Sequence, residues 1–66
     1  MNKGTVRFYN HVKGLGLIKD IESEKEYFVH STGLIDTINI GDKVSFDLQE
    51  GKKGWSAVNV MLVTDY

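Results

Sequence analysis

Apolar residues alternate with polar or small residues in five short segments of the chain, and this period of two predicts β-strands. The clearest segment is 43–48, where Val44, Phe46 and Leu48 fall on one face. The other four segments are 4–10, 13–18, 27–30 and 56–63. Residues 31–39 are less regular and allow a helical turn at most.

Five strands without a long helix predict an all-β fold. Closure into a small barrel would remove the exposed sheet edges that invite aggregation. The 66 residues contain no proline, no repeat and no linker-like stretch, so we expect one domain over residues 1–66. The side chains expected in its core are Val6, Ile18, Val29, Val44, Phe46, Val58 and Val60.

The segment 13–18 is unusual because Gly14 and Gly16 alternate with Leu15 and Leu17. Glycine in a strand costs conformational entropy and packs nothing, which indicates bending or close approach by another backbone or a ligand. The two leucines would share one face of the strand.

Two assignments of faces are open for the second and third strands. In the first, Ile18 and Val29 point inward and an apolar platform lies outside, made of Leu15, Leu17, Phe28 and His30. In the second, the register slips by one residue and these side chains form the core instead. We favour the first assignment, because a buried histidine would need a hydrogen-bond partner inside a very small barrel.

Composition excludes several kinds of site. Without cysteine the chain forms neither disulfides nor thiolate metal sites, and its two histidines are too few for a zinc site unless carboxylates are added. We therefore expect no metal and no cofactor. No grouping of nucleophile, base and orienting residue is apparent, so we expect no enzyme.

Nothing near the N-terminus resembles a signal peptide, and no apolar run approaches the roughly 18 residues of a membrane span. These features predict a soluble, cytoplasmic protein, and we expect a monomer rather than a dimer.

The charges are unevenly distributed although the net charge is −1. Residues 1–19 carry four basic side chains and no acidic one, whereas residues 20–50 carry eight acidic and two basic side chains. This asymmetry allows one face to be basic while the whole molecule is mildly acidic. A randomly solvated surface is the alternative interpretation.

Three motifs resemble the cold-shock domain family in order and spacing: Gly-Thr-Val-Arg-Phe-Tyr-Asn at 4–10, Lys-Gly-Leu-Gly-Leu-Ile at 13–18, and Tyr-Phe-Val-His at 27–30. The likeness continues into residues 41–46 and 57–60. The resemblance implies a five-stranded antiparallel Greek-key barrel, the OB-fold. It also implies a protein that binds single-stranded RNA or DNA with low sequence specificity, as an RNA chaperone that melts secondary structure.

The sequence departs from the family at several stacking positions. The family usually has phenylalanine where Leu15, Leu17 and Ser31 stand, and tryptophan where Phe8 stands. Leucine keeps apolar contact with a base but lacks the aromatic face. Trp55 lies near two lysines in the expected last hairpin loop, where we predict a compensating stacking surface; the alternative is an indole that plugs the barrel end.

The expected nucleic-acid site follows by position. Its stacking side chains are Phe8, Phe28, His30 and Trp55, its aliphatic contacts are Leu15 and Leu17, and its phosphate-attracting cations are Arg7, Lys13 and Lys53. A second hypothesis is a small protein-interaction barrel that uses the face formed by Leu15 and Leu17.

Overall fold

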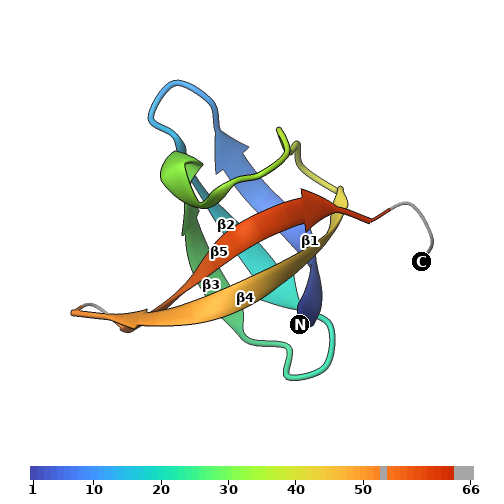
Figure 1. Ribbon diagram of the computed structural model, residues 1–66. Coiled ribbons are helices and arrows are strands. Elements are labelled where there is room, and N and C mark those ends of the chain that lie inside the picture. Colours follow the sequence, from blue (N-terminus) through green and yellow to red (C-terminus); the bar gives the residue numbers. More distant parts are fainter. Residues whose placement is uncertain (53, 64–66) are drawn as a thin grey trace.

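Five β-strands close into a barrel in the order β1-β2-β3-β5-β4, as Figure 1 shows. They are β1 (Asn2–Asn10), β2 (Leu15–Asp20), β3 (Glu26–His30), β4 (Lys43–Gly51) and β5 (Gly54–Leu62), and a single 3-10 turn, η1 (Ser31–Gly33), follows β3. The computed structural model describes residues 1–52 and 54–63. The predicted all-β fold and closed barrel are confirmed.

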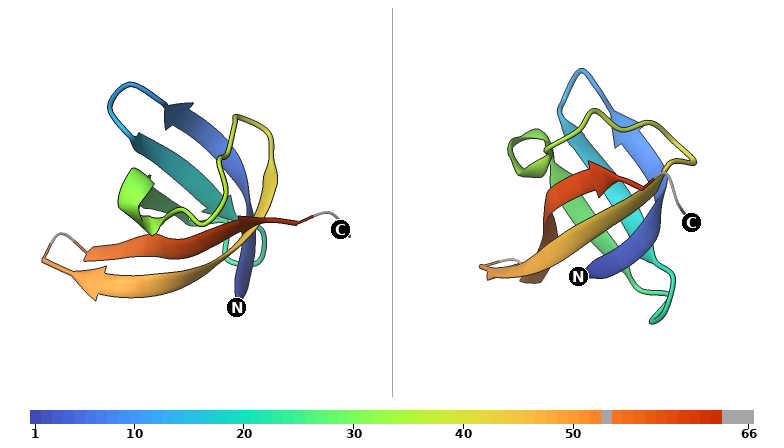
Figure 2. Two further views of the ribbon diagram at one scale, coloured as in Figure 1. Left: turned by 45° about the horizontal axis from the view of Figure 1, so that its top comes forward. Right: turned by 45° about the vertical axis from the view of Figure 1, so that its right-hand side comes forward.

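The barrel closes through one parallel pairing. Four neighbouring pairs of strands are antiparallel, whereas β3 and β5 run parallel and pair only at Phe28 with Ser56 and at Val29 with Ala57. The β4–β5 hairpin continues beyond this short contact, and it projects from the rest of the barrel in both views of Figure 2.

Fully buried apolar side chains fill the barrel. They are Val6, Ile18, Val29, Ile38, Val44, Phe46, Ala57 and Val60. Every predicted core residue except Val58 belongs to this cluster. The sequence pattern does not reveal Ile38, because this residue lies in the irregular connection between η1 and β4. Leu48 packs against the cluster but is only partly buried.

The expected core position of Val58 is wrong because β5 contains a bulge. Asn59 adopts a φ of 53°, and the β4–β5 register shifts at this point. The extra residue interrupts the alternation, so Ala57 and Val60 both face inward while Val58 is partly exposed. Strict alternation would also turn Leu62 inward with Val58 and Val60, but Leu62 is 44% exposed.

The protein itself fills the space beside the two glycines of segment 13–18. A Cβ atom on Gly16 would lie 2.5 Å from the carbonyl oxygen of Phe8 and 2.6 Å from Cδ1 of Tyr9. Gly14 lies in the β1–β2 turn rather than in the strand; its φ is 67°, and a Cβ there would lie 2.7 Å from Oγ of Ser31. The close approach that the glycines predict is therefore made by neighbouring segments of the chain.

A buried carboxylate holds the opposite end of β2. Asp20 accepts hydrogen bonds from the Asn2 side chain at 2.8 Å and from the backbone N–H groups of Glu22 and Ser23. The Asn2 bond contributes most to lowering the pKa of Asp20 below its ordinary value, with the backbone bonds assisting and burial opposing. The charged carboxylate thereby fixes the β2–β3 turn against the start of β1.

None of the helices that the structure describes has the length and apolar character needed to cross a membrane.

Candidate nucleic-acid interface

An apolar platform covers the outer face of β1, β2 and β3. It consists of the four side chains predicted for it, Leu15, Leu17, Phe28 and His30, together with Phe8 of β1, and we use the name for these five residues from here on. Phe8, Leu17 and Phe28 are register partners and make one row across the three strands. Leu15 and His30 are paired in a second row. The platform thus joins side chains from three segments that the turns bring together.

The exposure of these side chains decides between the two assignments of faces. Phe28 is 66% exposed and Leu15 is 41% exposed, whereas Ile18 and Val29 on the other face are completely buried. The outward platform is therefore confirmed, and the register slip that would bury it is wrong. Leu17 is partly covered.

A second β-bulge brings Phe8 onto the platform. Val6 pairs with Ile18 and Phe8 pairs with Leu17, so Arg7 is an extra residue on β1. Strict alternation from the buried Val6 would turn Phe8 inward. The bulge instead leaves both Arg7 and Phe8 exposed, with Phe8 47% exposed. A cation and an aromatic ring consequently lie next to each other at this edge of the platform.

The ring of His30 is held by the turn that follows it. The backbone N–H of Thr32 donates to Nδ1 of His30 at 3.3 Å, and the Thr32 hydroxyl lies 3.1 Å from the same nitrogen. An Nδ1 that accepts this bond leaves the proton of the neutral ring on Nε2. The exposed imidazole is thus oriented in advance at the end of β3.

The β1–β2 loop supplies a cation next to the platform. The Asn10 side chain accepts from the backbone N–H groups of Val12 and Lys13, at 3.0 and 3.1 Å. These bonds shape the loop locally, as an Asx turn does. Lys13 is exposed there, two residues before Leu15. Lys53, the other lysine expected to attract phosphates, lies outside the described residues.

Trp55 lies on β5 rather than in a loop, as its second residue, paired with Glu50 across the hairpin. Its side chain is 52% exposed and does not belong to the core. The interpretation in which the indole plugs the barrel is therefore wrong.

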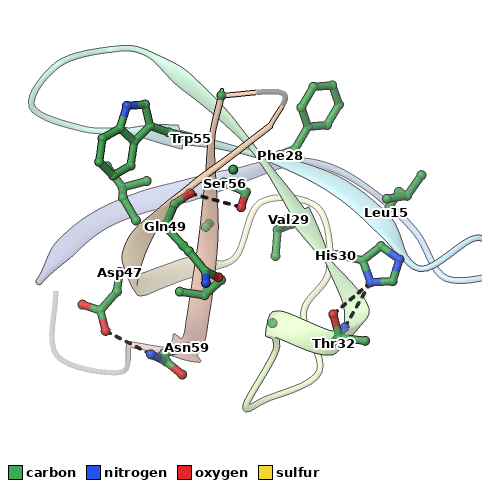
Figure 3. A pocket seen from close by; sticks show the side chains of 16 residues that line it. Leu15, Phe28, Val29, His30, Thr32, Asp47, Gln49, Trp55, Ser56 and Asn59 are labelled. Atoms are coloured by element: carbon green, nitrogen blue, oxygen red, sulfur yellow. Dashed lines mark hydrogen bonds between the residues drawn. The ribbon is translucent and has the colours of Figure 1, made fainter.

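A hollow of about 960 Å³ lies between β3 and the β4–β5 hairpin (Figure 3). Phe28 and His30 of the platform line one side of this hollow, and Trp55 lines the other. The strand pattern does not predict the hollow, because it depends on how β3 and β5 pair and then separate. Gln49 and Thr32, which no sequence pattern indicated as site residues, also line it.

Residues 1–52 and 54–63 contain no cluster of three or more histidine, aspartate or glutamate side chains suited to a metal ion.

A closed five-stranded barrel with an exposed aromatic and aliphatic face has the architecture of an OB-fold, a class that binds oligonucleotides. Residues 2–63 match the family described as the 'Cold-shock' DNA-binding domain. The chain belongs to this cold-shock domain family, whose members bind nucleic acid.

Named relatives agree with this assignment. The chain is 37% identical over 65 residues to cold shock-like protein CspC of Shigella flexneri, covering 92% of this chain and 94% of the relative. It is 39% identical over 62 residues to CspC of Buchnera aphidicola, covering 88% and 90%. It is 38% identical over 63 residues to CspE of the same organism, covering 89% and 91%.

Proposed function

We propose that the protein binds single-stranded RNA or DNA with low sequence specificity and acts as an RNA chaperone. The observation that carries this proposal is the row formed by Phe8, Leu17 and Phe28, which crosses three strands with both aromatic rings exposed. Unpaired bases present flat apolar faces that stack on such rings whatever their sequence. Bases in a duplex are already stacked on each other, so the platform favours the open strand.

Melting of secondary structure then follows from mass action. Binding to unpaired nucleotides lowers the free energy of the open strand, and hairpins shift towards it without nucleotide hydrolysis. Leucines in place of aromatic rings suit this role, since they keep apolar contact with a base and give up part of the stacking energy. Weaker contact at Leu15 and Leu17 favours rapid release.

Basic side chains at the edges of the platform would interact with the phosphates. Arg7 is exposed beside Phe8, and Lys13 is exposed in the loop that leads into β2. We assign the same role to Lys53. These contacts would attract any single strand without reading its sequence.

A substitution at Phe28 tests the platform. We expect Phe28→Ala to weaken binding of a short pyrimidine-rich strand by about 1–3 kcal/mol, because one base loses its stacking partner. Fluorescence anisotropy of a labelled oligonucleotide measures the loss, and circular dichroism checks that the barrel remains folded.

Ile40 offers a matched control, since its side chain is also 66% exposed but lies in the connection between η1 and β4. Ile40→Ala should bind as the wild type does. A folded Phe28→Ala variant with unchanged affinity would refute the platform assignment.

A protein-interaction barrel is the second candidate function. The observation in its favour is that aliphatic Leu15 is 41% exposed on this face. The same titration separates the two functions: a wild-type chain without affinity for single strands would favour a protein partner.

A further inference from the structure

The hollow beside the platform exists because two paired strands separate. β3 and β5 are in register only at Phe28 with Ser56 and at Val29 with Ala57. Towards the hairpin end, β5 stays with β4 up to the pairing of Gly51 with Gly54 and leaves β3. Figure 3 shows the result, with the rings of Phe28 and Trp55 on opposite sides of the opening.

The chemistry of the hollow suits an uncharged ring rather than a phosphate. No lysine or arginine is present among the described residues that line it, and Asp47 contributes a carboxylate. One oxygen of Asp47 accepts from the Asn59 side chain at 3.2 Å. The negative charge of Asp47 makes this side of the hollow unfavourable for an anion such as a phosphate.

The Gln49 side chain gives the hollow a hydrogen-bonding group that is not otherwise used. The side-chain amide of Gln49 lines the hollow and has no hydrogen-bond partner among the described residues. The backbone oxygen of Gln49 accepts a hydrogen bond from the Ser56 hydroxyl at 3.5 Å. An amide offers one donor and one acceptor side by side, which matches the paired groups on the edge of a nucleobase.

We propose that the hollow is a second nucleobase site, in which a base of the same single strand stacks on Trp55 while the Gln49 amide contacts its edge. This inference rests on the proposed function, because the strand must first lie on the platform. The hollow is continuous with the platform, because Leu15, Phe28 and His30 belong to both. A strand bound on the platform could therefore place its next base in the hollow. A volume of about 960 Å³ leaves room for a nucleobase, since it lies at the upper end of ordinary ligand pockets.

Abasic nucleotides test the site directly. A single-stranded oligonucleotide of about eight nucleotides, within the range of one OB-fold, is prepared with one abasic position moved along it. An abasic nucleotide keeps its phosphate and lacks only the base. We expect one position at which the loss of the base weakens wild-type binding by roughly 5- to 100-fold and reduces quenching of Trp55, the only tryptophan.

The same strands are then titrated against variants. Trp55→Ala should bind the intact strand as weakly as the wild type binds the strand with the abasic nucleotide at the identified position. Removal of the base at that position should not lower the affinity of Trp55→Ala further. Trp55→Phe retains a ring and should restore most of the affinity. Phe8→Ala serves as the matched control, since it should abolish the effect of a different abasic position on the platform.

The outcomes separate this inference from the function on which it depends. If Trp55→Ala binds as tightly as the wild type while Phe28→Ala binds more weakly, the second site is wrong and the platform stands. If Trp55→Ala lowers affinity equally for intact and abasic strands, stacking of a base in the hollow is likewise refuted. If the wild type binds no single strand, both proposals fail.

The role of Gln49 has its own test. Exchange of the four bases at the position found by the abasic scan should change wild-type affinity, and the Gln49→Leu variant should reduce these differences. Equal base preferences in the two proteins would show that the amide does not contact the base.

Discussion

Gly16 shows how a missing side chain shapes one end of the barrel. Because no Cβ is present, Tyr9 lies close over the β2 backbone and packs against the core. The Tyr9 ring also meets His11 edge-on, with ring centroids 4.8 Å apart. Nε2 of His11 lies 3.0 Å from the Asn39 side-chain oxygen. One glycine thus allows a chain of contacts that joins the β1–β2 loop to the connection before β4.

Substitution of this glycine should therefore destabilise the barrel. We expect Gly16→Ala to lower the free energy of unfolding by about 1–3 kcal/mol, because the added methyl group overlaps the backbone of Phe8 and the ring of Tyr9. Urea denaturation followed by circular dichroism measures the change. Gly51→Ala is the control, since its Cβ would meet only the Gly54 carbonyl, at 3.6 Å. Equal stabilities of the two variants would contradict this account of the packing.

The two β-bulges decide where alternation of apolar and polar residues predicts correctly which side chains face the core. β2 and β3 pair without a shift in register, so alternation holds along both strands, and the expected cost of burying His30 selected the correct face. β1 and β5 each contain a bulge, at Arg7 and Asn59, and alternation fails beyond it. Phe8 was expected in the site through family resemblance, whereas Val58 was placed in the core by periodicity alone. A bulge depends on the partner strand, so the local sequence does not reveal it.

The bulge in β5 leads us to predict how substitutions of Asn59 change the stability of the protein. Its φ of 53° lies in the left-handed region, which asparagine and glycine tolerate better than other residues. We expect Asn59→Ala to be less stable than Asn59→Gly by about 1 kcal/mol. Both variants lose the hydrogen bond to Asp47, so their difference isolates the backbone conformation. Chemical denaturation provides the comparison, and an alanine variant as stable as the glycine variant would show that the bulge is not strained.

The order of the strands in the closed barrel brings side chains from distant segments together in one site. The platform was largely predictable, because β1, β2 and β3 follow one another through short turns. The hollow was not, because it requires β5 to return beside β3 in parallel over only two residue pairs. Trp55 could accordingly be selected as an exposed aromatic residue, but its position opposite Phe28 follows only from the closed barrel.

The same topology separates the charges of a protein whose net charge is −1. Hairpin geometry places the β1–β2 loop, with Lys13, at one end of β2 and the acidic β2–β3 turn, with Glu22 and Glu24, at the other. In Figure 1 these two turns lie at opposite ends of the molecule. A polyanion would therefore meet a locally basic edge beside the platform, although the whole chain is mildly acidic.

Salt dependence measures this local effect. Each phosphate contact to a single strand contributes about −0.7 to the slope of log affinity against log salt, and three contacts give a slope of about −2. Lys13→Gln should make the slope shallower by about 0.7, as measured by anisotropy titrations over a range of NaCl concentrations. Lys25→Gln removes the same charge from the β2–β3 turn and should leave the slope unchanged, because no phosphate is released there. If both substitutions reduce the slope equally, net charge rather than a basic edge governs binding, and the assignment of Lys13 fails.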